Sequence, residues 1–388
     1  MVASLKKESN PLWFLALLAP VSVVMAALCG VWRHTNIASA SRETSALISM
    51  AASTSERNSN FQVNGRPNDI CRFDSKLYSS PQVTTETDFA SYVNDLQAAI
   101  CAEVEALDGS GKKFCIDRWE RDPSNPSAGY GITRVLEGGD LIEKGAANVS
   151  IIKGVLTPQR AQSMSTRGRN INPEGGDPYT AAAMSLVFHP RSPLVPTLRA
   201  DVRVFEVAGS KWYGGGCDLT PVYLCEEDAK HFHHYWKGVC DEHHKDYYPR
   251  FKKWCDEYFY IPARKEHRGV GGIFFDDLSE SPSGEDAEPF VRAVGNAIVG
   301  SWKAIVEQSR SLPYTEEQRQ WQLLRRGRYL EFNLLYDRGV KFGMEGGRVE
   351  SIMVSAPPLI AWKYNVQPEE GSEELKLIET LRKPREWI

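Results

Sequence analysis

Arginines that stand beside glycine or inside apolar segments are the residues in this sequence best suited to binding a charged ligand. They are Arg191, Arg203, Arg268, Arg325, Arg326, Arg328, Arg338 and Arg348. A guanidinium binds a carboxylate bidentately, and a sheltered charge-assisted hydrogen bond contributes about 1.5–3 kcal/mol. Glycine lets a ligand approach the backbone closely. Any one arginine could instead form a surface ion pair of about 0–1 kcal/mol, but the set favours a small molecule with several carboxylates.

Three strand-like segments gather polar side chains on shared faces, because side chains alternate along a strand. These faces hold Ser185, Val187 and His189; Arg199, Asp201, Arg203 and Phe205; and Glu331, Asn333, Leu335 and Asp337. Met184, Leu186 and Phe188 point the other way, into a core. A sheet with one solvated face is the simpler explanation for each strand. Helices are numerous enough to cover both faces, however, and covered polar side chains need partners or a ligand.

A histidine cluster has residue types that could bind a metal. His231 and His234 lie one helical turn apart, with His233 between them, so the outer pair could share an ion. No carboxylate or third ligand follows at a typical spacing. We therefore predict no metal site here.

Two further clusters could be reactive. Cys217 beside Asp218, with His189 as its base, could form a cysteine nucleophile, although the surrounding sequence matches no hydrolase pattern. Asp276 and Asp277 at a strand end could bind a divalent ion, but a turn cap is the simpler explanation. We expect structural roles for both clusters.

Helices and strands alternate along the part of the chain that would position these residues. Apolar periodicity predicts helices over residues 85–107, with Thr85 and Asp88 as a capping signature, 226–244, 248–258, 290–305, 315–327 and 370–381. Alternating or β-branched runs predict strands over residues 131–137, 148–155, 184–189, 201–207, 272–276, 329–336 and 349–355. Short connections favour antiparallel pairing. The predicted fold is α+β: a single domain with a large, mostly antiparallel β-sheet flanked by helices on both faces.

The composition excludes several classes of protein. The chain has 388 residues, with 46 Lys+Arg against 50 Asp+Glu and a formal net charge of −4. Nucleic-acid binding depends on clustered basic residues, which this balance does not favour. No C-x-x-C motif occurs among the 8 cysteines, so buried free thiols are expected.

The start of the chain differs from the rest and predicts targeting. Lys6 and Lys7 precede an uncharged, largely apolar segment from Pro11 to Trp32, long enough to span a bilayer. A stretch rich in Ser, Ala and Thr, poor in acids and containing arginines follows. This order predicts a two-part presequence over residues 1–65 that engages a membrane and then directs residues 66–388 to a plastid. A single membrane anchor and a mitochondrial presequence are the alternatives.

Six long motifs resemble those of the oxygen-dependent coproporphyrinogen III oxidase family. They are SLVFHPRSPLVPT, KWYGGGCDLTPVYL, FKKWCDEYFYIPAR, RGVGGIFFDDL, RRGRYLEFNLLYDRG and SIMVSAPPLIAWKY. The similarity extends from about Phe114 to Trp387. It implies a homodimer that converts two propionates of coproporphyrinogen III to vinyls, giving protoporphyrinogen IX in haem and chlorophyll synthesis. O₂ would be the acceptor, CO₂ and peroxide would be released, and no metal or organic cofactor would be needed.

The resemblance also implies roles for individual residues. Asp218 would accept hydrogen bonds from pyrrole N–H groups, and Arg203 would hold the propionate being cleaved. Other expected substrate-binding residues are Ser185, His189, Asp201, Val202, Gly346, Gly347 and Arg348, with Asp337 and Arg338 close to the site. The segments Trp212–Gly216 and Gly269–Gly272 are candidate lid loops.

Three positions depart from the family pattern. Arg199 occupies the position of the proposed proton-donor histidine, Asp201 that of an asparagine, and Ala263 that of a further histidine. Arginine stays protonated and is a poor general acid. Either the histidine is not essential, or His189 or solvent replaces it, or the activity is altered. Arg199 and Asp201 could pair on one face, a coupled exchange that keeps the geometry. A non-catalytic porphyrinogen-binding paralogue is the alternative function.

Overall fold

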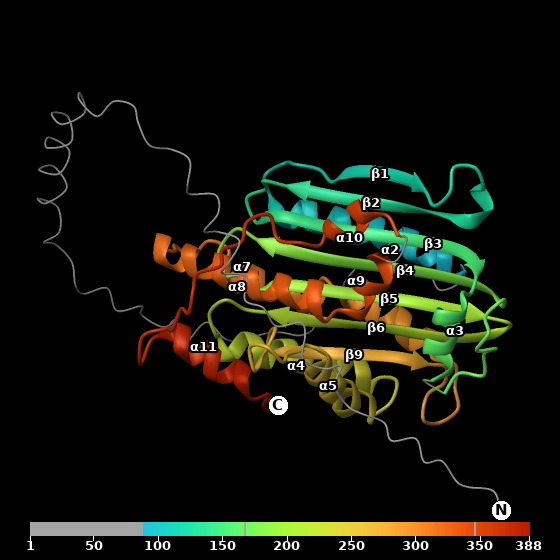
Figure 1. Cartoon of the computed structure of the whole chain (residues 1–388). Coiled ribbons are helices and arrows are strands. Elements are labelled where there is room, and N and C mark those ends of the chain that lie inside the picture. Colours follow the sequence, from blue (N-terminus) through green and yellow to red (C-terminus); the bar gives the residue numbers. More distant parts are fainter. Residues whose placement is uncertain (1–87, 167, 345–346) are drawn as a thin grey trace, which may run out of the picture. The chain divides into compact units, whose positions relative to one another are not determined.

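The fold is that of a computed structural model, which describes residues 88–166, 168–344 and 347–388 (Figure 1). These residues lie within one compact unit. The predicted presequence, residues 1–65, and Gly346 lie outside the described residues. In the part of the chain that is described, no helix is long and apolar enough to cross a membrane.

In the described part of the chain, seven strands form one sheet in the order β1-β2-β3-β4-β5-β6-β9, and every neighbouring pair is antiparallel. The strands are β1 (Cys115–Glu120), β2 (Gly129–Glu137), β3 (Ile142–Val155), β4 (Pro178–Pro190), β5 (Thr197–Val207), β6 (Ser210–Thr220) and β9 (Gly271–Leu278). A separate pair is formed by β7 (Tyr260–Ile261) and β8 (Glu266–His267). The predicted α+β fold with an antiparallel sheet is confirmed.

Helices cover both faces of the sheet (Figure 1). We call the side carrying Ser185, Asp201 and Asp218 the front face. Across the back face lie α2 (Phe89–Asp108), α6 (Glu288–Ala297) and α7 (Gly300–Ser309), and across the front face lie α8 (Glu316–Leu335), α9 (Arg338–Met344) and α10 (Val349–Met353). The remaining helices are α3 (Pro158–Ser165), η2 (Pro126–Ala128), α4 (Glu226–Asp241), α5 (Tyr247–Tyr258) and α11 (Glu373–Arg382).

The main apolar core lies between the sheet's back face and its helices. Met184, Leu186 and Phe188 are at most 4% exposed there, as their alternation predicts. Helix α2 begins at Phe89. The residue before it is Asp88, whose carboxylate accepts the N–H of Ser91. The helix thus takes Asp88, rather than Thr85, as its N-cap.

The predicted helix over residues 290–305 is two helices. Helix α6 ends at Ala297 and α7 starts at Gly300, although Ile298 and Val299 between them keep right-handed helical backbone angles. Both helices contribute to the back-face core, which explains why one apolar periodicity continues through the break. Tertiary packing, not the local pattern, sets this boundary.

The predicted strand over residues 329–336 is wrong, because this segment is the second half of α8. The helix starts with a capping box between Thr315 and Gln318, as predicted, but continues past Gly327 to Leu335. A Cβ at Gly327 would lie 2.7 Å from the Ala361 carbonyl oxygen, so this glycine permits close approach of a later segment and does not end the helix. Helical spacing, not alternation, therefore determines which of its residues are buried.

The predicted strand over residues 349–355 is also wrong, since α10 occupies Val349–Met353. This segment lies on the front face and not at an open edge of the sheet. A strand placed there would have unpaired backbone groups, whereas a helical turn satisfies part of its own hydrogen bonding.

Strand β6 was not predicted, and neither was β1. Three consecutive glycines from Gly214 to Gly216 make β6 a weak strand former in isolation. It is held by β5 on one side and β9 on the other. The predicted lid loop Trp212–Gly216 is therefore wrong: it is part of an interior strand. The second candidate, Gly269–Gly272, is not a free loop either, because Gly271 and Gly272 are the first two residues of β9.

Candidate functional site

Five charged side chains of alternating sign form what we call the charge ladder on the front face. Arg199 Nη1 lies 2.7 Å from Asp201 Oδ1, and Arg203 pairs with the other oxygen of Asp201. Arg203 Nη2 continues to Asp276 Oδ1 at 3.2 Å, and Arg338 Nη2 lies 3.7 Å from Asp276 Oδ2. The predicted pairing of Arg199 with Asp201 is confirmed.

The charge ladder is more open at one end than at the other. The side chain of Arg199 is 18% exposed, that of Arg203 is 30% exposed and that of Arg338 is 51% exposed. Burial alone would lower the pKa of Arg203, but the carboxylates of Asp201 and Asp276 outweigh it and raise that pKa. Arg203 is therefore a fixed cation at the accessible part of the charge ladder.

Asp218 lies deeper, in a buried pair with Arg268. Arg268 Nη2 donates to Asp218 Oδ1 at 2.8 Å and to Oδ2 at 2.7 Å, and Arg268 Nη1 donates to Asn333 Oδ1 at 3.2 Å. The two side chains are 1% and 3% exposed. The guanidinium also lies 4.0 Å from the ring centroid of Phe259. Both oxygens of Asp218 are thus already engaged by a cation, and its role toward pyrrole N–H groups stays a prediction.

Small side chains next to the charge ladder form what we call the open floor. It consists of Ser150, Ala181, Ala183 and Ser185, which share the front face of β3 and β4 and are exposed or half-buried. Ser185 stands opposite Asp201, and Ala183 stands opposite Arg203. A flat ligand could therefore approach the sheet closely while reaching Arg203.

Arg348 lies at the other side of this floor. Its Nη2 is 2.7 Å from Asp117 Oδ2 on β1, and its Nη1 donates to Ser351 Oγ at 3.1 Å. The register aligns Asp117 with Thr133, Asn148, Ser185 and Asp201 on successive strands. Asp117 and Asp201 are four strand spacings apart, about 19 Å at about 4.8 Å each. The structure thus separates Arg348 from Arg203 and places both on the same face; Gly347 beside Arg348 is exposed.

His189 is held under the front-face helices. Its Nε2 lies 3.0 Å from the Ser355 carbonyl oxygen, and its ring packs against Tyr329. Burial, followed by the cation of Arg326, lowers the pKa of His189 to about 3. The imidazole is neutral at physiological pH, so the suggestion that His189 replaces the family's proton donor is not supported by its environment.

Two other predicted residues have different surroundings. The side chain of Val202 points to the back face, where it is fully buried, so a contact of this residue with substrate would have to come from its backbone. Asp337 accepts the N–H of Val340 at 3.0 Å, at the start of α9. Asp337 also helps to raise the pKa of Arg199, after burial and the carboxylates of Asp201 and Asp218. Asp337 thus acts on the charge of Arg199, and its role toward substrate stays a prediction.

The histidine and cysteine clusters considered for other chemistry have structural roles, whereas Asp276 of the third cluster belongs to the charge ladder. His233 lies 2.9 Å from Tyr248 Oη and 3.0 Å from the Val270 carbonyl oxygen. Cys217 points into the back-face core, opposite to Asp218, and burial raises its thiol pKa well above the ordinary value. No group of three or more potential metal ligands occurs among residues 88–166, 168–344 and 347–388.

Arg268, Asp276 and Tyr258 are site residues that the sequence analysis did not place. Asp276 lies two residues after Phe274 on β9, so strand alternation could have put both on the front face. Arg268 was noted only as one arginine among several, and its partner Asp218 is 50 residues away in the chain. No local signal indicates that pairing.

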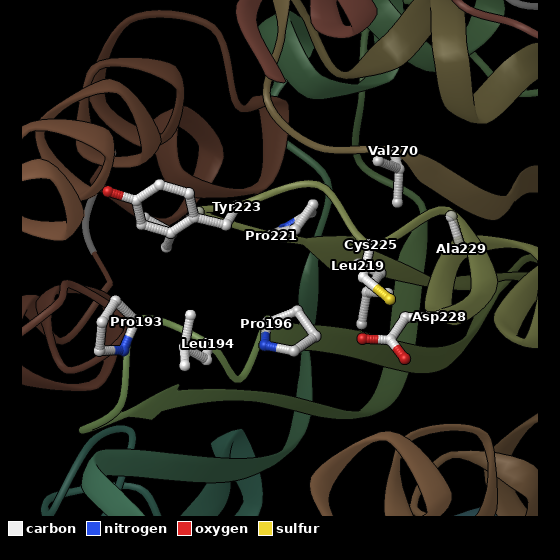
Figure 2. Close-up of a pocket in the computed structure, with 11 residues that line it drawn as sticks. Pro193, Leu194, Pro196, Leu219, Pro221, Tyr223, Cys225, Asp228, Ala229 and Val270 are labelled. Carbon is white, nitrogen blue, oxygen red and sulfur yellow. The ribbon is translucent and has the colours of Figure 1, made fainter. Parts of the chain in front are cut away.

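Figure 2 shows a small pocket that is separate from this site. It is lined by Pro193, Pro196, Leu219, Tyr223 and Asp228, among others. Leu219 belongs to the back-face core, whereas the charge ladder lies on the front face. The pocket therefore does not contribute to the arrangement of arginines.

Known proteins resemble this chain over most of its length. The sequence profile of a family described as coproporphyrinogen III oxidase matches residues 88–387. An oxygen-dependent coproporphyrinogen-III oxidase from Drosophila melanogaster is 45% identical over 84% of this chain and 86% of its own length. Coproporphyrinogen-III oxidase 1, chloroplastic, from Arabidopsis thaliana is 44% identical over 80% of this chain and 81% of its own length. The mitochondrial oxygen-dependent coproporphyrinogen-III oxidase from Homo sapiens is 45% identical over 76% of this chain and 65% of its own length. The chain belongs to the coproporphyrinogen III oxidase family.

Proposed function

We propose that this protein catalyses the oxygen-dependent oxidative decarboxylation of two propionates of coproporphyrinogen III, giving protoporphyrinogen IX. The observation that carries the proposal is the open floor between two separated guanidiniums, Arg203 and Arg348, on one face of the sheet. A macrocycle with carboxylates around its rim could present one of them to each of these cations. The floor side chains are small enough for the ring to lie against the strands.

The charge ladder suggests how a propionate would be held. Arg203 already pairs with Asp201 and Asp276, so its position is fixed before substrate arrives. A propionate carboxylate would bind at the exposed part of this guanidinium and beside Arg338. A preorganised cation of this kind orients the reacting side chain with little loss of conformational entropy.

We further propose that the reaction needs O₂ but no metal or organic cofactor. The family resemblance and the electron-rich pyrroles of the substrate, which could react with O₂ themselves, support this. The test is to treat the purified protein with chelator, add coproporphyrinogen III with and without O₂, and follow CO₂ and the fluorescence of the oxidised product. Turnover that needs O₂ and resists chelator is expected. Tight binding without turnover would instead indicate a non-catalytic porphyrinogen-binding protein.

The Arg199–Asp201 pair leads to a prediction about the departure from the family pattern. Arg199→His is expected to change kcat less than about tenfold, because the charge ladder keeps Arg203 bound to Asp201 and Asp276. The measurement is the steady-state rate of CO₂ release. An increase of several orders of magnitude would refute a neutral exchange and would show that Arg199 suppresses activity.

We propose that the protein is a homodimer that uses an apolar surface of its C-terminal part. Leu359 and Trp362 are 54% and 55% exposed, and Tyr364 is fully exposed. Other large apolar residues exposed in this part are Leu334, Leu335, Met344 and Val349. Exposed apolar side chains gathered in one part of a chain are typical of interfaces, and the family resemblance supports a second copy as the partner.

The dimer prediction is tested by sedimentation equilibrium. Tyr364→Glu is expected to weaken self-association by at least tenfold, because it places a charge inside the interface. Tyr314→Glu is the matched control, since Tyr314 is also exposed, at 40%, but precedes α8. A wild-type protein that stays monomeric at micromolar concentration would contradict the proposal, as would equal effects of both variants.

We propose that the chain acts inside an organelle, specifically a plastid reached through a two-part presequence. The order of charged, apolar and Ser-rich segments in residues 1–65 supports this, and relatives bear the names chloroplastic and mitochondrial. Expression of residues 1–65 fused to a fluorescent protein in cells of the source would distinguish plastid from mitochondrion.

A further inference from the structure

Tyr258, the last residue of α5, stands beside the charge ladder. Its ring stacks on Phe274 with centroids 4.2 Å apart and an angle of 10° between the planes. The guanidinium of Arg203 lies 5.8 Å from the centroid of the same Phe274 ring. Phe274 is on the front face, opposite Gly216 in the register. The phenol and the cation expected to hold the propionate therefore share one aromatic support.

The hydroxyl of Tyr258 faces the open end of the charge ladder. Its oxygen accepts the backbone N–H of Arg338 at 3.2 Å, and the Arg338 guanidinium lies 5.1 Å from its ring centroid. Arg338 and Arg203 both reach Asp276. The backbone N–H occupies an oxygen lone pair and leaves the phenolic hydrogen for another acceptor.

The proposed reaction consumes one proton for each vinyl group that forms. The C–C bond to the carboxylate breaks and CO₂ leaves. The electron pair of that bond becomes the second bond of the vinyl, while the neighbouring CH₂ loses a hydrogen with its two electrons. O₂ accepts this hydride equivalent and one proton, giving H₂O₂. A proton donor near the propionate is therefore needed.

Arg199, Arg203 and His189 are poor donors at neutral pH. Arg199 and Arg203 have pKa values raised by nearby carboxylates despite their burial, so both stay protonated. His189 is neutral and held beneath Ser355. Burial, followed by the carboxylate of Asp337, raises the pKa of Tyr258, so its hydroxyl is protonated at neutral pH and would give up the proton only to a strong base such as the reduced oxygen.

We propose that Tyr258 is a catalytic residue that donates this proton from its hydroxyl to the reducing oxygen and is then reprotonated by solvent. This inference rests on the proposed function. It assigns to a phenol at the end of α5 the task that the family pattern gives to a histidine at the position of Arg199.

The test compares Tyr258→Phe with the wild type. The phenylalanine keeps the stack on Phe274, so we expect an unchanged melting temperature, a kcat lowered by about 100-fold, and a KM changed by less than about threefold. Tyr260→Phe is the control, because Tyr260 packs against His267 away from the charge ladder. A wild-type kcat in Tyr258→Phe, or a loss confined to KM, would overturn the proposal.

A second measurement does not depend on the Phe variant being well folded. Difluorotyrosine placed at position 258 keeps the hydroxyl and lowers the phenol pKa. A general acid loses activity as the pH rises through its pKa, so the alkaline limb of the kcat profile should move to lower pH. An unmoved limb would overturn the role of Tyr258. Absence of turnover in the wild type would instead overturn the proposed function.

Discussion

Replacing Arg268 with methionine is expected to lower the free energy of unfolding by about 3–5 kcal/mol. The change leaves the carboxylate of Asp218 buried without the guanidinium that contacts both of its oxygens. The side chain of Asp218 is 3% exposed, so its uncompensated charge would have little access to water. The measurement is chemical denaturation of the purified variant, with the denaturation midpoint and slope compared with those of the wild type.

Two further variants make this test specific. Lys253→Met breaks an exposed ion pair with Glu257, whose side chains are 80% and 64% exposed, and should cost at most about 1 kcal/mol. Adding Asp218→Leu to Arg268→Met removes the stranded charge and should recover much of the lost stability, since apolar replacements of buried pairs are often tolerated. An Arg268→Met protein as stable as the wild type would show that the buried pair does not hold the site together.

Replacing Arg203 with glutamine should lower kcat/KM by about 100-fold. The variant loses charge-assisted hydrogen bonds to the propionate, each worth about 1.5–3 kcal/mol, and it leaves Asp201 and Asp276 with one cation fewer. Arg203→Lys keeps the charge but lacks the planar guanidinium that binds a carboxylate bidentately. Its kcat/KM should therefore lie between those of the wild type and Arg203→Gln. Steady-state kinetics of vinyl formation provide the measurement.

The control for Arg203 is Arg250→Gln, because Arg250 is exposed on α5 and packs on Phe251. Its kcat/KM should match that of the wild type within about twofold. If Arg203→Gln behaved like this control, the propionate would not bind at the charge ladder. The open floor would then have to be assigned to another ligand.

Local patterns in the sequence were sufficient wherever a segment's own residues decide its conformation. The alternation in Met184–His189 correctly separated core from front-face side chains, and Thr315 with Gln318 correctly marked the start of α8. The pairing of Arg199 with Asp201 followed from a period of two along one strand. Each of these signals spans only a few residues.

Long-range contacts decided the parts that the sequence did not reveal. The segment around Tyr329 alternates like a strand, yet it is helical because the helix started at Thr315 continues and packs on the front face. Strand β6, with Gly214–Gly216 at its centre, is held by its two neighbours. In both segments, tertiary packing outweighs weak or misleading local preference.

By itself, the sequence determined the family, the α+β class and the arginines and carboxylates available for a polycarboxylate ligand. Only the tertiary structure decided which of them meet. It joined Arg268 to Asp218 across 50 residues, moved Arg348 to Asp117 at the far strand, and brought Tyr258 beside Arg203 through Phe274. Charge and periodicity are properties of short segments, whereas the partner of a buried charge is set by the register and packing of the whole sheet.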